Sequence, residues 1–155
     1  MKKMIMAALV LVLTAAGAHA GDSFAVGIRA GAATNYSSQH YEAFGDLYLN
    51  KLVSIGATAA FTVVDRTHLN TVRRDEAVPI TALFKVHAPV PLINPYAGAG
   101  QAVIFHDKRG TKGSPVLLAG VDFSFSPTPL FLNVEYRRQF DDKLNIIAGG
   151  VGVKF

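Results

Sequence analysis

Three residues near one predicted loop are of the types that hydrolytic enzymes use. Ser114 could act as a nucleophile, His106 as its base and Asp107 as the acid that orients the base. A catalytic triad needs the histidine between the other two groups, within hydrogen-bond reach of both. Because His106 and Asp107 are adjacent, they would point to opposite faces of a strand. The spacing argues against a catalytic site, and we predict that the chain is not an enzyme.

The residue types and their spacing also give little reason to expect a metal or a cofactor. The sequence has no cysteine, which excludes disulfides and thiolate metal sites. His40, His68, His87 and His106 lack the spacing of metal ligands. The short run Gly98-Ala99-Gly100 is not followed by a glycine at the third position of the loop motif, nor by a helical pattern, so it does not predict a nucleotide-binding loop. We therefore expect no metal and no cofactor.

The first 20 residues have the pattern of a signal peptide. Lys2 and Lys3 precede an apolar run from Met4 to Leu13, and Ala18-His19-Ala20 is a small-x-small cleavage pattern. A run of about ten apolar residues is too short for a membrane-spanning helix. We predict residues 1–20 as a signal peptide for the general secretory route and residues 21–155 as one domain. The two leader lysines supply half of the formal charge of +4, so the remainder does not predict a nucleic-acid partner.

From residue 21 onward the dominant hydrophobic period is two, which is the period of a β-strand. Half of the whole chain is hydrophobic, yet no stretch of the mature chain is a continuous apolar run of helix-spanning length. The alternation recurs in segments of about ten residues, separated by turn-rich breaks. This pattern predicts an all-β fold, an eight-stranded antiparallel transmembrane up-and-down β-barrel. The segments are 24–31, 42–49, 53–63, 78–86, 95–105, 117–125, 130–137 and 147–155.

Two positions disturb the alternation. Pro79 has no N–H to donate to a ladder, so we expect an irregularity or a bulge near the start of its strand. Gln101 falls in phase with Ala99 and Val103 on the apolar face, where lipid would disfavour an amide. A bulge in that strand would turn Gln101 away from the lipid.

The other face of the predicted strands carries ionisable side chains of both signs. Side chains fill the interior of a barrel of about eight strands, so we expect these groups to form an ion-pair network that fixes the register. The alternative is a gated path for protons or ions through the same charges. The cations are Arg29, Lys85, Arg137 and Lys154, and the anions are Glu42, Asp46, Asp122 and Glu135.

The breaks between the strands alternate between polar segments and tight or proline-rich ones. Polar breaks are expected outside the cell, which would put both termini on the periplasmic side. The polar breaks are Thr34–His40, Asp65–Glu76, Asp107–Gly113 and Gln139–Lys143. Two of them carry cations that could bind lipopolysaccharide phosphates or could simply be solvated, namely Arg66, Arg73, Arg74, Lys108, Arg109 and Lys112.

Three stretches of sequence resemble a known family. Val78-Pro79-Ile80-Thr81-Ala82-Leu83-Phe84-Lys85 followed by Asn94-Pro95-Tyr96-Ala97-Gly98-Ala99-Gly100 resembles the small outer-membrane β-barrel superfamily that includes OmpA and OmpX. The terminal Gly150-Val151-Gly152-Val153-Lys154-Phe155 resembles its C-terminal assembly signal, in which Val151, Val153 and Phe155 share one face. The resemblance covers essentially the whole mature chain. It implies a Gram-negative outer-membrane protein that the barrel-assembly machinery inserts.

Taken together, these observations predict a monomeric, non-enzymatic outer-membrane barrel with a plugged lumen and exposed loops. Its partners would be outer-membrane lipid and lipopolysaccharide, and its role envelope integrity or surface interaction. Two alternatives stay open. An outer-membrane enzyme that modifies lipid A would need a nucleophile and a base that converge. A soluble periplasmic binder of the lipocalin type would instead turn its apolar face inward.

Overall fold

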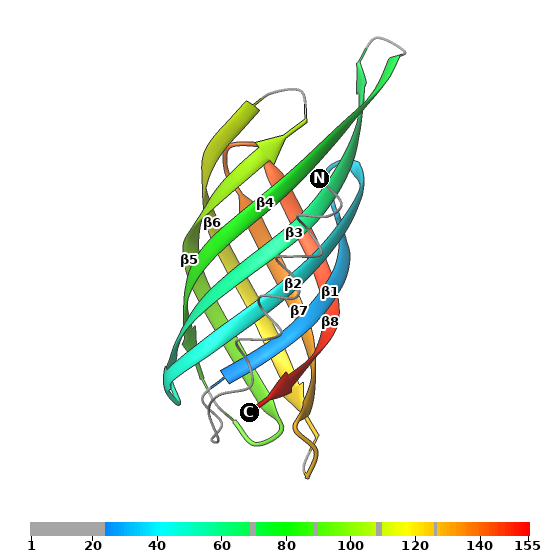
Figure 1. The fold of residues 1–155 in the computed structure, drawn as a ribbon. Coiled ribbons are helices and arrows are strands. Elements are labelled where there is room, and N and C mark those ends of the chain that lie inside the picture. Colours follow the sequence, from blue (N-terminus) through cyan, green and yellow to red (C-terminus); the bar gives the residue numbers. More distant parts are fainter. Residues whose placement is uncertain (1–23, 69–70, 89, 108–109, 126) are drawn as a thin grey trace.

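The computed structural model describes residues 24–68, 71–88, 90–107, 110–125 and 127–155, so the predicted signal peptide and its cleavage site lie outside the described residues. Each strand pairs in antiparallel fashion with its neighbours in sequence, and the first also pairs with the last, which closes a barrel (Figure 1). The strands are β1 (Phe24–Ala33), β2 (Ser37–Asn50), β3 (Val53–His68), β4 (Thr71–His87), β5 (Ile93–His106), β6 (Gly110–Ser124), β7 (Leu130–Gln139) and β8 (Leu144–Lys154). The prediction of an eight-stranded antiparallel barrel is confirmed.

Among the described residues, no helix is long and apolar enough to cross a membrane.

The alternation of each strand separates an apolar outer wall from a mixed interior. Large apolar side chains on the outside are strongly exposed, for example Ile28 at 62% and Phe84 at 51%. Their neighbours in sequence, such as Arg29 and Lys85, are buried inside the barrel at 3% and 1% exposure. A soluble binder of the lipocalin type would show the opposite arrangement, so the structure contradicts that alternative. The wall is built to contact lipid.

The strands are longer at one end than the sequence pattern indicated. The polar stretch Asp65–Glu76, expected to be a loop, belongs almost wholly to β3 and β4, which form the long hairpin that extends from the top of the barrel in Figure 1. Strand pairing uses backbone groups, so polar side chains do not end a strand that has left the membrane. We call this end of the barrel, which holds the β1–β2, β3–β4, β5–β6 and β7–β8 turns, the loop end. The opposite end, where β1 begins and β8 finishes, is the terminal end.

Neither of the two disturbed positions is bulged. The register between β3 and β4 is the same on both sides of Pro79, with Ala59 opposite Ile80 and Thr62 opposite Ala77, although no pairs form between these points. Gln101 pairs with Ala82 on β4 and with Pro115 on β6, again without a shift. Gln101 is therefore an exposed residue on the outer wall, and no bulge turns it away from the lipid.

The outward run of β3 offers a direct test of the wall. Ala57 is exposed and lies midway along this run. We expect Ala57→Arg to destabilise the folded barrel by about 2–4 kcal/mol, because a cation near the bilayer midplane loses its hydration. Unfolding midpoints of the protein refolded into lipid vesicles measure the effect. Ala57→Leu keeps the position apolar and serves as the matched control. Equal midpoints for the two variants would show that β3 has the opposite phase.

Candidate functional site

Four charged side chains meet in the centre of the lumen and form what we call the central ion cluster. Arg29 on β1 and Glu42 on β2 are partners in register, and Glu135 and Arg137 come from β7 across the lumen. Glu42 contacts both guanidinium groups through its two carboxylate oxygens. Glu135 lies 2.5 Å from Arg29 and 2.6 Å from Arg137. Each charge therefore touches two of the opposite sign, in side chains at most 5% exposed.

The other four predicted lumen charges form two separate pairs. Lys85 Nζ on β4 donates to Asp46 Oδ2 on β2 at 2.8 Å, and this pair is buried. Lys154 Nζ on β8 lies 3.9 Å from Asp122 Oδ2 on β6, and the lysine side chain is 21% exposed near the terminal end. The structure thus places all eight predicted charges on the inner face, each next to an opposite charge. In each of these two pairs the partners come from strands that are not neighbours.

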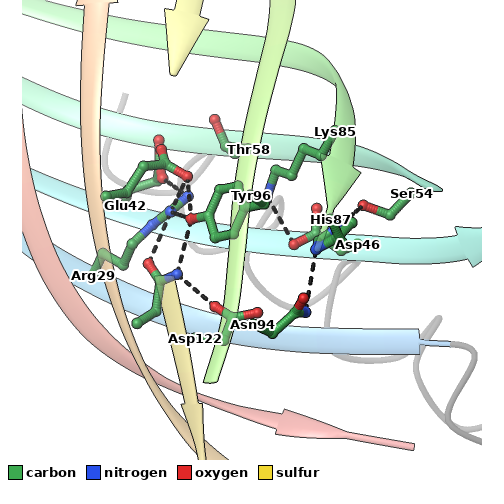
Figure 2. Close-up of polar contacts among 12 residues, drawn as sticks. Arg29, Glu42, Asp46, Ser54, Thr58, Lys85, His87, Asn94, Tyr96 and Asp122 are labelled. Atoms are coloured by element: carbon green, nitrogen blue, oxygen red, sulfur yellow. Dashed lines mark hydrogen bonds and ion pairs between the residues drawn. The ribbon is translucent and has the colours of Figure 1, made fainter. Parts of the chain in front are cut away.

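Two neutral side chains join the charged groups, and sequence reasoning gave neither a role (Figure 2). The Tyr96 hydroxyl donates to Glu135 Oε2 at 2.7 Å and accepts from Asn133 Nδ2 at 2.9 Å. Asn133 also donates to Asp122 Oδ1 at 2.7 Å and accepts from Arg29 at 3.0 Å. The inward phase of Tyr96 and Asn133 was the one signal in the sequence that could have found them. They link the central ion cluster to the Asp122–Lys154 pair.

Inward glycines make room for the largest of these side chains. A Cβ added to Gly120 on β6 would fall 2.5 Å from the Tyr96 ring. One added to Gly150 on β8 would fall 2.0 Å from the Ile28 carbonyl oxygen and 2.6 Å from Arg29 Cγ. Such distances are far inside van der Waals contact. In the lumen, a long side chain therefore occupies the space beside a glycine, which has no side chain of its own.

A second polar group lies nearer the loop end, around His106 on β5. Its Nε2 lies 3.2 Å from Asp142 in the β7–β8 turn, and its Nδ1 lies 3.7 Å from Asp75 on β4. These side chains line a cavity of about 10 Å³, room for about one water molecule. Among the residues that the structure describes, no group of three or more histidine and acidic side chains is arranged to hold a metal ion.

The three residues considered for a hydrolytic triad do not meet. Ser114 Oγ donates to Pro115 O at 3.2 Å and accepts from Asp141 N at 3.0 Å, so its contacts are structural. His106 contacts two acids other than Asp107, which is exposed at the end of β5. Within the described part of the chain, these three residues share no hydrogen bond.

The predicted lipopolysaccharide contacts fall mostly outside the described side chains. Lys108 and Arg109 lie outside the described residues. For Arg66, Arg73 and Arg74 the structure describes the backbone alone, with Arg66 opposite Arg73 in the hairpin. Lys112 is described, and its Nζ lies 3.4 Å from Asp141 at a half-exposed position. Their role remains a prediction.

The predicted assembly signal lies at the terminal end of the seam between β1 and β8. Val151 and Phe155 face outward, at 48% and 42% exposure. Val153, in the same phase, is partly buried and pairs with Val26 and Leu130. The backbone of Phe155 exchanges two hydrogen bonds with Phe24, at 2.7 and 3.2 Å. The last residue thus completes the ladder that closes the barrel.

Comparison with known proteins identifies the architecture. No protein-family model matches the sequence, and no curated protein matches it. Among solved structures, Neisserial surface protein A is similar with a TM-score of 0.64 and 17% identity, over 86% of this chain and 97% of that one. OprG from Pseudomonas aeruginosa is similar with a TM-score of 0.68 and 12% identity, over 85% and 95%. The chain has the fold of the small outer-membrane β-barrels. Together with the exposed apolar wall, this fold places the protein in the outer membrane.

Two further solved structures show that the fold hosts different activities. Ail of Yersinia pestis, in complex with the heparin analogue sucrose octasulfate, has a TM-score of 0.51 and 16% identity over 86% of this chain and 97% of that one. The outer membrane enzyme PagL has a TM-score of 0.51 and 10% identity over 84% and 99%. At these identities the likeness concerns the fold alone.

The central ion cluster makes a clear energetic prediction. Glu42→Gln removes a carboxylate that two buried guanidinium groups share, and we expect it to cost about 3–5 kcal/mol of folding stability. Asp141→Asn breaks the half-exposed pair with Lys112 and should cost about 0–1 kcal/mol. Urea unfolding of both variants in the same lipid gives the comparison. A Glu42→Gln barrel as stable as Asp141→Asn would show that the cluster does not hold the fold together.

Proposed function

We propose that this protein is a non-enzymatic element of the outer-membrane wall, whose lumen is plugged by its own side chains. The observation that carries the proposal is the central ion cluster, which connects β1 and β2 to β7 across the lumen through buried groups. Tyr96, Asn133 and Lys85 fill the interior beside it. Side chains fill the interior of a barrel of about eight strands, so we expect this lumen to be closed and the barrel to act as a wall element and not as a pore.

An enzymatic role has weaker support. A hydrolase needs a nucleophile and a base in contact. Ser114 is hydrogen-bonded to backbone groups, and His106 lies between two acids that hold strand and turn together. The likeness to an outer membrane enzyme is one of fold, so it adds no catalytic residue to this chain.

The proposed role at the surface follows from the charge of the loop end. Four of the candidate lipopolysaccharide contacts, Arg66, Arg73, Arg74 and Lys112, belong to strands that reach this end. The other two, Lys108 and Arg109, come between β5 and β6 in the sequence. Outer-membrane barrels place their polar loops outside the cell, so these cations would face lipopolysaccharide phosphates. The polyanion bound to the similar protein Ail supports the same chemistry. We propose a monomeric barrel that contributes to envelope integrity through its wall and its outer surface, and that the barrel-assembly machinery inserts.

Pore activity tests the plugged lumen. In planar bilayers we expect the purified protein to give no steady, porin-sized conductance, because side chains fill the interior of an eight-stranded barrel. Arg137→Ala removes two contacts of the central ion cluster and should raise the frequency of small openings or lower the unfolding midpoint. Lys51→Ala, at an exposed turn, should do neither. Large, stable openings in the wild-type protein would refute the plug.

Deletion of Phe155 tests the assembly signal. We expect less folded barrel in the outer membrane and unchanged processing of the precursor, because the change removes the last rung of the β1–β8 seam and the terminal aromatic side chain. The folded fraction is measured by heat-modifiable migration on gels. Phe123→Ala, an outward phenylalanine of β6, is the control for loss of an aromatic ring alone. The assignment fails if the deletion and the control give the same folded yield.

A further inference from the structure

The outward side chains of β7 change from aliphatic to aromatic and basic toward the loop end. It begins with three aliphatic side chains, and these are followed by Tyr136, Arg138 and, just after the strand, Phe140. Tyr136 and Phe140 are exposed at 42% and 41%, and Arg138 between them is also exposed. Aromatic residues mark the two interfaces of a membrane barrel. Arg138 therefore lies at the level where the apolar core of one leaflet meets its headgroups.

Arg138 differs from the two lumen arginines in its partners. Arg29 and Arg137 each contact two carboxylates, whereas Arg138 makes no ion pair within the described part of the chain. Its guanidinium carbon instead lies 5.3 Å from the centre of the Phe140 ring. A guanidinium that stacks on a ring keeps its N–H donors available at its edge. An unneutralised cation with free donors at this level is suited to an anionic headgroup.

The residues around Arg138 add donors. Asn145 on β8 is its partner in register, and its Oδ1 accepts from the Tyr136 hydroxyl at 3.1 Å, which leaves the amide Nδ2 as a donor. Lys143, exposed in the adjoining turn, adds a second positive charge. The acids of this turn are engaged elsewhere. Asp141 lies 3.4 Å from Lys112, and Asp142 is buried against His106.

We propose that Arg138, Lys143 and Asn145 form a site on the outer wall for a phosphate group of lipid A, the membrane anchor of lipopolysaccharide. Two parallel N–H bonds from the guanidinium match two phosphate oxygens, the lysine supplies charge, and the asparagine supplies a further donor. The site rests on the proposed function in one respect, that the loop end faces the outer leaflet. It differs from the loop cations considered above because it lies on the lipid-facing side of the wall.

Native mass spectrometry of the folded barrel, released from micelles that contain lipid A, tests the site. We expect the wild-type protein to retain lipid A in a saturable manner, and Arg138→Gln to weaken retention about tenfold. Arg138→Lys keeps the charge and loses the paired donors, so it should lie between the two. Lys51→Gln removes one positive charge at the terminal end and is the matched control, with retention unchanged. Heat-modifiable migration checks that each variant is folded.

Three further measurements decide what is bound. The wild-type protein should retain dephosphorylated lipid A as weakly as the Arg138→Gln variant retains intact lipid A. Inorganic phosphate should displace lipid A only at high concentration. Equal retention by wild-type protein and Arg138→Gln, or equal retention of dephosphorylated lipid A, would overturn the proposal. A preference for phosphatidylglycerol over lipid A would overturn it as well, because the site would then serve an inner-leaflet phospholipid. Should Arg138→Gln not fold, Lys143→Gln replaces it, with a smaller loss expected. Conductance of the same wild-type sample reports on the plugged lumen separately.

Discussion

Backbone N–H and C=O groups find no water inside a bilayer, so each strand needs a neighbour on both sides. Here the requirement is met by the ladder between β1 and β8, in which Ala25 to Ala33 pair with Lys154 to Ile146. Closure with eight strands leaves an interior as narrow as the side chains that line it. Charged side chains in such an interior are therefore stabilised mainly by opposite charges from the other strands. The ring of Arg29, Glu42, Glu135 and Arg137 is a consequence of that closure.

The phase of most strands could be predicted, because lipid selects apolar side chains at every second residue. Around Pro79 and Gln101 the sequence left the phase open. The eight charges of the central ion cluster and of the two lumen pairs were identified in this way, whereas the buried acids Asp75 and Asp142 beside His106 were not. Which charge contacts which could not be predicted, because the partners of Glu42 depend on how far the strands are staggered around the barrel. Tyr96 and Asn133 were missed for a related reason. A neutral polar side chain in a strand gives no sign of its role until its neighbours across the lumen are known.

The ends of the strands were predicted less well than their phases. Polarity was taken as a sign of a loop over Asp65–Glu76, yet two polar segments pair as readily as two apolar ones once lipid no longer selects their side chains. An irregularity or a bulge was expected at Pro79, and the structure has the irregularity without the bulge. Pro79 pairs with Ile104 on β5, and the ladder toward β3 omits Ala60 and Phe61. A missing N–H removed local pairs and left the register intact.

The fit between inward glycines and large side chains has a consequence for how this sequence can change over time. A side chain at Gly120 would displace Tyr96, and with it the hydroxyl that bonds both Glu135 and Asn133. The Tyr96 side chain thus serves both the packing of the lumen and the hydrogen bonding of its charged groups. At this site a larger residue in place of Gly120 would need a smaller one in place of Tyr96, so the two positions are expected to change together. Outer-wall positions outside the assembly signal and the proposed lipid A site contact only lipid, so each can change by itself from one apolar residue to another. Along each strand, the outward residues should therefore differ more among related sequences than the inward residues that alternate with them.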